Sequence, residues 1–229
     1  MKKIKLLKIF LPNSLEETYS KIINNPFKIG AQNGFEPIKL SGNYACAKFI
    51  EEVLSKELII DPFGNTEEFI SKRYIINEFT ISSIRNDYIL ILENPSRSVR
   101  ELIRKLSEIL GTSFYASAIQ IDIHALSEFL SNNHDSIHLK NTRALLSGIN
   151  LDEGSSATIE ITSLKDAIHD AKHHFKGKTF KIERARFTAS SGTKKSTVEV
   201  RSTGLISVHG PEEKSLVELI NMFIAEGLS

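Results

Sequence analysis

The densest group of side chains that could do chemistry in this 229-residue sequence is a set of cations between positions 172 and 201. Nine Lys and Arg residues face only two acids, Glu183 and Glu199, which gives these 30 residues a net charge of +7. Fixed cations with Ser and Thr between them can hold the phosphates of a nucleic-acid backbone. The nine are Lys172, Lys176, Lys178, Lys181, Arg184, Arg186, Lys194, Lys195 and Arg201.

Six of these cations are the candidate phosphate contacts. Arg184 and Arg186 are two residues apart, so on a strand they point to one face. Lys181 has the opposite parity and joins that face only through a bulge, which a change of apolar phase between Ile182 and Ala185 suggests. A solvated outer sheet face with a Lys-rich hairpin tip has the same composition. The nucleic-acid-binding candidates are Lys181, Arg184, Arg186, Lys194, Lys195 and Arg201.

A second group of side chains could hold a metal ion. His169 and His173 are four residues apart, and Asp166 and Asp170 lie at neighbouring helical positions. Two imidazoles on one helix face beside carboxylates can bind a first-row metal. A polar, solvent-facing side of a helix has the same pattern, and the sequence offers no oriented outer partners for a catalytic metal.

Other catalytic patterns are sparse. His134 and His138 are also four apart, and such a pair could act as acid and base in a ribonuclease. Cys46 falls on an apolar stripe, which favours a core position over a nucleophile. There is no phosphate-binding Walker motif, dinucleotide-binding glycine motif, nucleophile elbow or zinc-protease motif. We therefore expect a non-catalytic protein with no cofactor.

The composition limits the class of protein. With 41% hydrophobic and 25% charged residues, the chain is globular in composition, and its net charge of +1 excludes a generally basic nucleic-acid coat. One cysteine excludes a disulfide framework and a Cys-rich zinc module. No apolar run approaches the ~20 residues of a membrane span, so no membrane partner is expected. The single thiol fits a reducing cytoplasm.

Hydrophobic periodicity gives the elements that must position these residues. Apolar residues at helical spacing predict helices over 43–56, 98–110, 163–176 and 211–226. Segments rich in Ile, Val, Phe and Thr predict strands, and 132–155 reads as loop or short helix. The fold class is therefore α+β, with a mainly antiparallel sheet and helices packed on one face. The strands are 3–11, 73–83, 87–93, 117–123, 156–162, 179–189, 196–202 and 205–209.

The chain length accommodates two α+β halves, 1–115 and 116–229. Each half contains a similar pentapeptide at a strand end, at 79–83 (FTISS) and at 187–191 (FTASS). Each pentapeptide is followed by strand, Pro and helix, with one more strand in the second half. This order indicates a degenerate duplication.

The second half resembles a known fold over residues 155–227. The order there is strand, helix, three strands, helix, and residues 197–211 read TVEVRSTGLISVHGP, in which Gly204 supplies a tight turn. This pattern is similar to one half of the TATA-binding-protein fold, which also occurs in the N-terminal domain of one bacterial ribonuclease H class and in the N-terminal modules of the RNase LS toxin family. The resemblance implies a β-α-β-β-β-α unit at 156–226, often with a sheet that faces nucleic acid. The Phe pairs that kink DNA in the transcription factor are missing here.

Together these features favour a non-catalytic binding module that contacts nucleic acid or an effector protein. The resemblance to the toxin modules points to a bacterial toxin–antitoxin or phage-defence setting. Two alternatives stay open. One is a protein–protein adaptor or homo-oligomeric scaffold that pairs through a sheet face or an edge strand. The other is a His- or metal-dependent nuclease.

Overall fold

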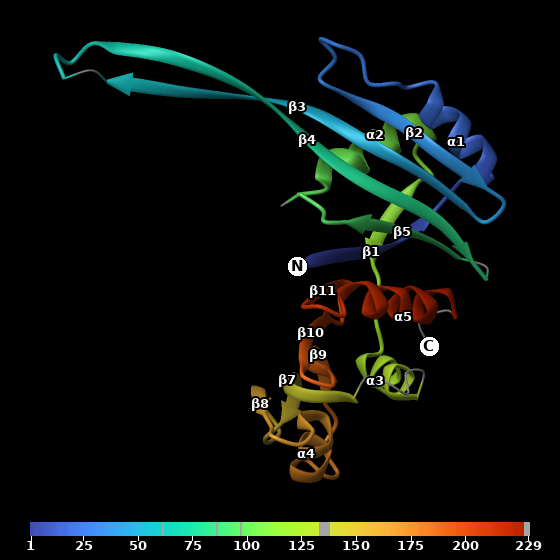
Figure 1. Cartoon of the computed structure of the whole chain (residues 1–229), viewed down its shortest axis with the longest axis vertical. Helices are drawn as coiled ribbons and strands as arrows, with labels where there is room; N and C mark the ends of the chain where they lie inside the picture. The colour runs from blue at the N-terminus through green and yellow to red at the C-terminus, as the bar shows by residue number, and fades with distance from the viewer. Residues whose placement is uncertain (61, 86, 97, 133–137, 227–229) are drawn as a thin grey trace. The chain divides into compact units, whose positions relative to one another are not determined.

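The computed structural model describes residues 1–60, 62–85, 87–96, 98–132 and 138–226. Within these ranges the protein is α+β with a mainly antiparallel sheet, as predicted, and it contains eleven strands in one sheet and five helices (Figure 1). The strand order is β2-β3-β4-β5-β1-β11-β10-β9-β7-β8, and β6 pairs with β1. No described helix is long and apolar enough to cross a membrane.

Internal contacts divide the chain into two compact units. Unit 1 comprises Met1–Lys8 and Ser117–Ser229, and unit 2 comprises Ile9–Ala116. The sequence suggested a division between residues 115 and 116. Each unit is described separately below.

Unit 2 is a helix, a four-stranded antiparallel meander and a second helix. Its core is built around Phe35, whose ring centroid lies 5.4 Å from that of Phe49 and 6.1 Å from that of Phe79. All three rings are fully buried, as are Leu102 and Leu106. The elements are α1 (Leu15–Ile23), β2 (Asn33–Ser41), β3 (Tyr44–Ile60), β4 (Thr66–Ile84), β5 (Asp87–Glu93), α2 (Arg100–Leu110) and the start of β6 (Tyr115–Ala118).

Unit 1 repeats this plan with an insertion. It has a helix, a meander of β7, β9, β10 and β11, and a final helix, while β8 and α4 are inserted after the first strand of the meander. The order from β8 to α5 is the strand, helix, three strands, helix predicted for 156–226. Its elements are β1 (Lys2–Phe10), α3 (Ile123–Asn132), β7 (His138–Asn150), β8 (Ser156–Thr162), α4 (Ala167–His174), β9 (Lys181–Ser191), β10 (Lys194–Arg201), β11 (Leu205–His209) and α5 (Glu213–Ala225).

The two similar pentapeptides lie on strands that do not correspond to each other in the two units. Residues 79–83 lie on β4, the third strand of the unit 2 meander, whereas residues 187–191 lie on β9, the second strand of the unit 1 meander. The two units share an element order, but the short sequence match does not align corresponding strands.

The predicted helix over 43–56 is wrong, because these residues form β3. Burial alternates at Ala45, Ala47 and Phe49, which is the period of a strand. Helical spacing matched by coincidence because both faces of this strand carry apolar side chains. Cys46 is half-buried on the opposite face from Ala45, with Sγ 3.2 Å from Thr80 Oγ1.

The predicted loop or short helix over 132–155 is wrong over His138–Asn150, which form β7; residues 151–155 are a loop as predicted, and 133–137 lie outside the described residues. Register shifts occur between Asn141 and Arg143 and between Leu146 and Ile149, so the buried positions do not follow one simple alternation. Three more elements, α1, β2 and α3, were not predicted. The predicted strand 117–123 overlaps only the end of β6, at Ser117 and Ala118.

Three helix ends differ from the sequence pattern. Helix α2, predicted over 98–110, begins at Arg100 with Val99 as an N-cap that makes no side-chain hydrogen bond, and Glu101 pairs with Arg104 at 2.7 Å. Helix α4 begins at Ala167 with Asp166 as its N-cap, rather than at Ser163. Helix α5 begins at Glu213, two residues after Pro211.

Substituting Gly204, in the turn between β10 and β11, tests how closely the neighbouring atoms of unit 1 pack around this turn. Its φ is +83°, and an added Cβ would lie 2.4 Å from Ile119 Cγ2 and 2.7 Å from the carbonyl oxygen of Leu6. We expect Gly204→Ala to lower the free energy of unfolding by about 2–4 kcal/mol. Gly192→Ala is the control, because Gly192 also has a positive φ but open space around it; its cost should be about 1 kcal/mol. Equal losses in urea denaturation would contradict this interpretation.

Candidate nucleic-acid interface

The unit 1 sheet buries one face and exposes the other. On β10, Ser196, Val198 and Val200 are buried, so Glu199 and Arg201 point to the opposite side. The buried side is covered by α3 and α5, whose Phe129 and Phe223 rings lie 5.4 Å apart. We call the other side the open face.

Strand register arranges the open face in rows that cross the sheet. One row contains consecutive cross-strand partners from β1 to β7, and a second row continues to β8. The first row is Lys3, Ser207, Glu199, Arg186 and Arg143. The second row is Lys5, Leu205, Arg201, Arg184, Leu145 and Glu160.

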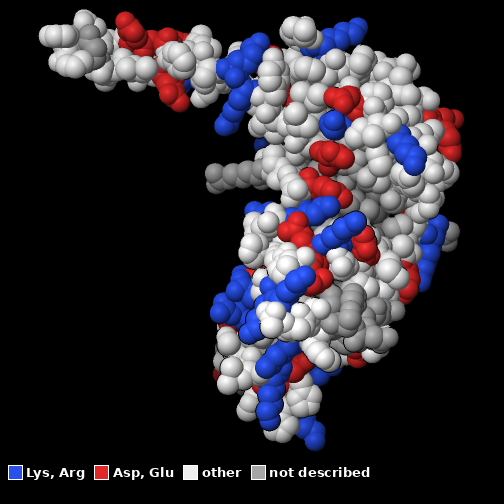
Figure 2. Space-filling model, viewed as in Figure 1, with Lys and Arg blue, Asp and Glu red and all other residues white. Residues whose placement is uncertain are grey.

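Cations dominate this face. Two further lysines share it, Lys140 opposite Thr188 and Lys195 opposite Ser190. Figure 2 shows Lys and Arg side chains gathered on the surface that the strands of unit 1 form. Apart from Lys181, which is paired with Glu183, eight cations therefore stand on the open face against Glu160 and Glu199. They are Lys3, Lys5, Lys140, Arg143, Arg184, Arg186, Lys195 and Arg201.

The predicted bulge in β9 is present. Leu145 pairs with Arg184 and the next residue, Leu146, pairs with Ile182, so Glu183 is the extra residue. The shift returns Lys181 to the parity of Arg184, opposite Ser147. Lys181 Nζ lies 3.4 Å from Glu183 Oε1, so this lysine is partly neutralised.

Lys194 does not join the other candidates. It pairs with Ser191 beside the β9–β10 turn and has the parity of the buried Ser196. Its side chain is exposed at the hairpin end, which matches the hairpin-tip interpretation for this residue. Five of the six predicted residues thus share one face, and Lys194 lies apart.

The open-face cations fall into two groups by their contacts. Arg184 Nη2 lies 2.9 Å from Glu160 Oε1, and Arg186 donates to Glu199 Oε2 through Nη2 at 2.7 Å and Nε at 3.3 Å. Within the described part of the chain, four other side chains make no hydrogen bond or ion pair and can bind an external anion. They are Lys140, Arg143, Lys195 and Arg201.

Lys5 is partly buried beside another cation of the open face. Its Nζ donates to the Thr203 carbonyl oxygen at 2.9 Å. Partial burial, and then the nearby Arg201, lowers the pKa of Lys5 below its ordinary value. An anion bound between Lys5 and Arg201 would relieve this repulsion.

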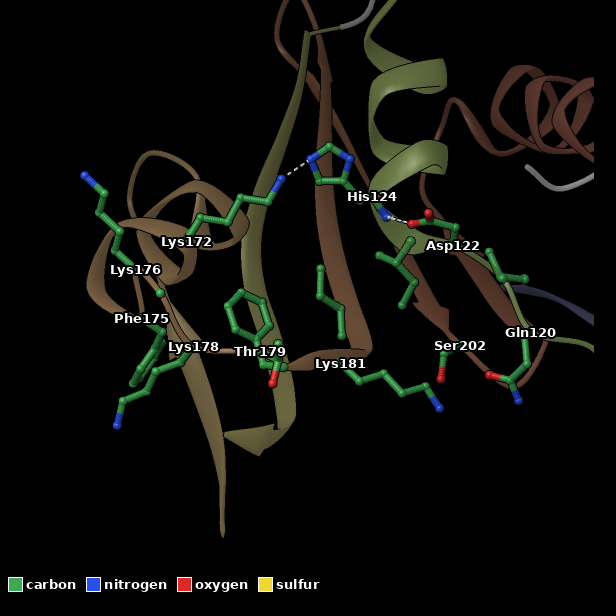
Figure 3. A pocket seen from close by; sticks show the side chains of 15 residues that line it. Gln120, Asp122, His124, Lys172, Phe175, Lys176, Lys178, Thr179, Lys181 and Ser202 are labelled. Carbon is green, nitrogen blue, oxygen red and sulfur yellow. Dashed lines mark hydrogen bonds between the residues drawn. The ribbon is translucent and has the colours of Figure 1, made fainter. Parts of the chain in front are cut away.

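A pocket of about 800 Å³ lies within unit 1 where β9 begins and β10 ends (Figure 3). Its apolar lining includes Phe175 and Phe180, whose rings contact edge to face at 6.4 Å. Four lysines border it, but their amines diverge: Lys172 reaches His124 and Lys181 extends toward Ser202, while the other two point away. The other two are Lys176 and Lys178.

The carboxylate and the imidazole among the described lining residues of this pocket, Asp122 and His124, are already engaged. Asp122 Oδ1 accepts from the backbone N–H groups of His124 and Ala125, at 2.8 and 3.1 Å, and thereby caps α3. His124 Nδ1 lies 3.4 Å from Glu128. These contacts give the pocket no acid–base pair aimed at a substrate.

The histidine face of α4 holds no assembled metal site. Asp166 caps the helix through the His169 N–H at 2.7 Å, and Asp170 accepts from Ser163 at 2.6 Å. Among the residues that the structure describes, no three His, Cys, Asp or Glu side chains are grouped closely enough to hold a metal. His134 lies outside the described residues, so its pairing with His138 is not described.

Four open-face cations were missed in the sequence. Lys3 and Lys5 are two apart on a predicted strand, which was a usable signal, but their position beside β11 depends on pairing with residues 200 positions away. Lys140 and Arg143 were missed because their segment was interpreted as loop.

No protein-family description matches the sequence, and no curated protein matches it. One solved structure, DynU16 from the dynemicin biosynthetic locus, aligns over 99% of this chain and 95% of its own. The identity is 10% and the TM-score is 0.18, values too low to indicate a shared fold.

The carboxylate of Glu183, at the β9 bulge, should make the free energy of unfolding depend on pH in the acid range. The hydrogen bond from Ser147 Oγ, at 2.8 Å, lowers the pKa of Glu183 below 4.5, and Ser202 and Lys181 add to this against the effect of partial burial. A lowered folded-state pKa stabilises the fold above about pH 4.5, and that stability is lost as the pH falls through the lowered value.

We therefore expect Glu183→Gln to be less stable than the wild type near neutral pH, with the difference shrinking below pH 4.5. Urea denaturation at a series of pH values measures this. Glu153→Gln, in an exposed turn, is the control and should give no such convergence. A stability difference that stays constant with pH would contradict the role given to the carboxylate.

Proposed function

We propose that the open face of unit 1 binds the phosphate backbone of a nucleic acid without catalysing a reaction. The observation that carries this proposal is the placement of eight Lys and Arg against two Glu on one exposed sheet face, in addition to the Lys181–Glu183 pair. Each cation that meets a phosphate releases condensed counterions, so a face of this kind gains affinity from many weak contacts.

The arrangement favours backbone contact over base reading. From Lys3 to Arg143 the first row crosses four strand spacings, or roughly 19 Å, which is enough to reach several phosphates. The described side chains of the two rows include no aromatic residue on which a base could stack. The arginines that already bind a carboxylate would either release it in favour of a phosphate or bind both anions through different N–H groups of the guanidinium.

The element order of residues 156–226 supports the same proposal, because the TATA-binding-protein-like halves that it resembles often turn a sheet toward nucleic acid. A toxin–antitoxin or phage-defence setting extends the proposal by resemblance alone. The engaged acids of the pocket and of α4 favour binding over nuclease chemistry.

The test is the affinity of the full chain for 20-nucleotide single-stranded RNA and for duplex RNA and DNA, measured by fluorescence anisotropy as salt is raised. The variant Arg143→Gln/Arg201→Gln removes two cations whose side chains make no hydrogen bond or ion pair with the described residues. It should weaken binding about tenfold or more and reduce the slope of log affinity against log salt by about 2.

A matched control removes two positive charges elsewhere. Lys165 and Lys214 are exposed on or near helices α4 and α5, away from the open face, so Lys165→Gln/Lys214→Gln should keep at least half of the wild-type affinity. No binding of any of the three probes near 50 mM salt, or equal losses in the two variants, would overturn the proposal. In the first case an acidic protein becomes the ligand class to test.

A further inference from the structure

Strands β3 and β4 extend beyond every neighbouring strand of unit 2. Pairing of β2 with β3 ends at Glu51, and pairing of β5 with β4 ends at Glu78. Farther out, β3 and β4 pair only with each other, as far as Ile60 opposite Thr66. Figure 1 shows this as a two-stranded projection. We call residues 52–60 and 62–76 the arm.

One face of the arm carries exposed large apolar side chains along its length, each beside charged residues that pair with one another. The register places even-numbered residues of both strands on the face opposite the buried Ala47 and Phe49. Six large apolar side chains occupy this even face, and each is 51–70% exposed. They are Leu54, Leu58, Ile60, Ile70, Tyr74 and Ile76.

The opposite, odd face has fewer exposed large apolar side chains, and its Val53 and Ile75 are half-buried. It presents Ser55, Glu57, Glu67, Ser71 and Arg73, interrupted by two exposed apolar side chains. Those two are Ile59 and Phe69, at 52% and 54% exposure. The two faces of one hairpin therefore differ, and the difference follows strand parity.

A two-stranded ribbon has no core of its own and is marginally stable in water. Contiguous exposed apolar patches above a few hundred Å² mark interaction surfaces. Burying roughly 100 Å² from each of six side chains, on two copies, removes about 1,200 Å² from water, which reaches the range of specific protein interfaces. A second copy therefore supplies enough area to cover the even face.

The charges on the even face also fit a second copy. Lys56 Nζ lies 2.6 Å from Glu68 Oε1, and Lys72 Nζ lies 2.9 Å from Glu52 Oε1. The face is thus neutral, with each charge paired within its own arm, and an identical face meets no surplus charge. Glu57 and Glu67, on the odd face, would repel an anionic lipid surface, which argues against such a surface as the partner.

We propose that two copies of this chain dimerise by packing the even faces of their arms against each other. The contact is isologous, because the same patch is used on both copies. It is independent of the nucleic-acid proposal, since the arm belongs to unit 2 and the open face to unit 1. Packed ribbons would lie about 10 Å apart, with Leu, Ile and Tyr side chains between them.

Analytical ultracentrifugation of the full chain tests this directly. The wild type should sediment as a dimer at micromolar concentration. Leu58→Glu/Ile70→Glu places two charges in the even face and should raise the dimer dissociation constant at least 100-fold. Ile59→Glu/Phe69→Glu makes the same chemical change on the odd face of the same hairpin and should change it less than threefold.

All four side chains are exposed, so circular dichroism should show unchanged secondary structure in both variants. Leu58→Ser/Ile70→Ser adds no charge and should also weaken the dimer. A wild type that stays monomeric up to roughly 100 µM would overturn the proposal, as would equal weakening by the even-face and odd-face variants. A monomer that binds neutral phosphatidylcholine vesicles through Leu58 and Ile70 would overturn it in favour of a lipid surface.

Discussion

Each strand of the unit 1 sheet sends alternate side chains to opposite faces, and burial of one set places the other set in water. Phe187, Val198 and Val200 are buried under α3 and α5. Because strand parity is fixed, the residues between them must be exposed. A slip of one residue in β10 would bury Arg201 and expose Val200. The apolar core thus sets the position of every cation on the open face.

The same parity governs the arm of unit 2, with a different result. There β3 and β4 leave their neighbouring strands, and Leu58 and Ile70 lie on a face that no described helix covers. In unit 1 the exposed face carries charge, whereas in the arm it carries apolar side chains. These two surfaces suit different ligands, a polyanion for the first and an apolar protein face for the second.

Sequence patterns were informative where contacts are local. The β9 bulge could be inferred from apolar phase alone, and β5, β8 and β11 have the predicted limits because turn residues bound them. The pattern predicted a helix where β3 forms, because apolar residues lie on both faces of this strand. Those on one face are buried in the core, and those on the other face are exposed along the arm. The position of Lys3 beside Ser207 depends on a pairing across almost the whole chain, which periodicity cannot reveal.

The most direct test of the central claim is lysine acetylation of the full chain, followed by mass spectrometry, with and without a bound 20-nucleotide RNA or DNA. If the open face holds the phosphates, acetylation of Lys140 and Lys195 should slow when nucleic acid is present, while Lys165 and Lys214 should react at unchanged rates. Protection of Lys165 and Lys214 without protection of Lys140 and Lys195 would contradict the assignment of the open face as the binding surface.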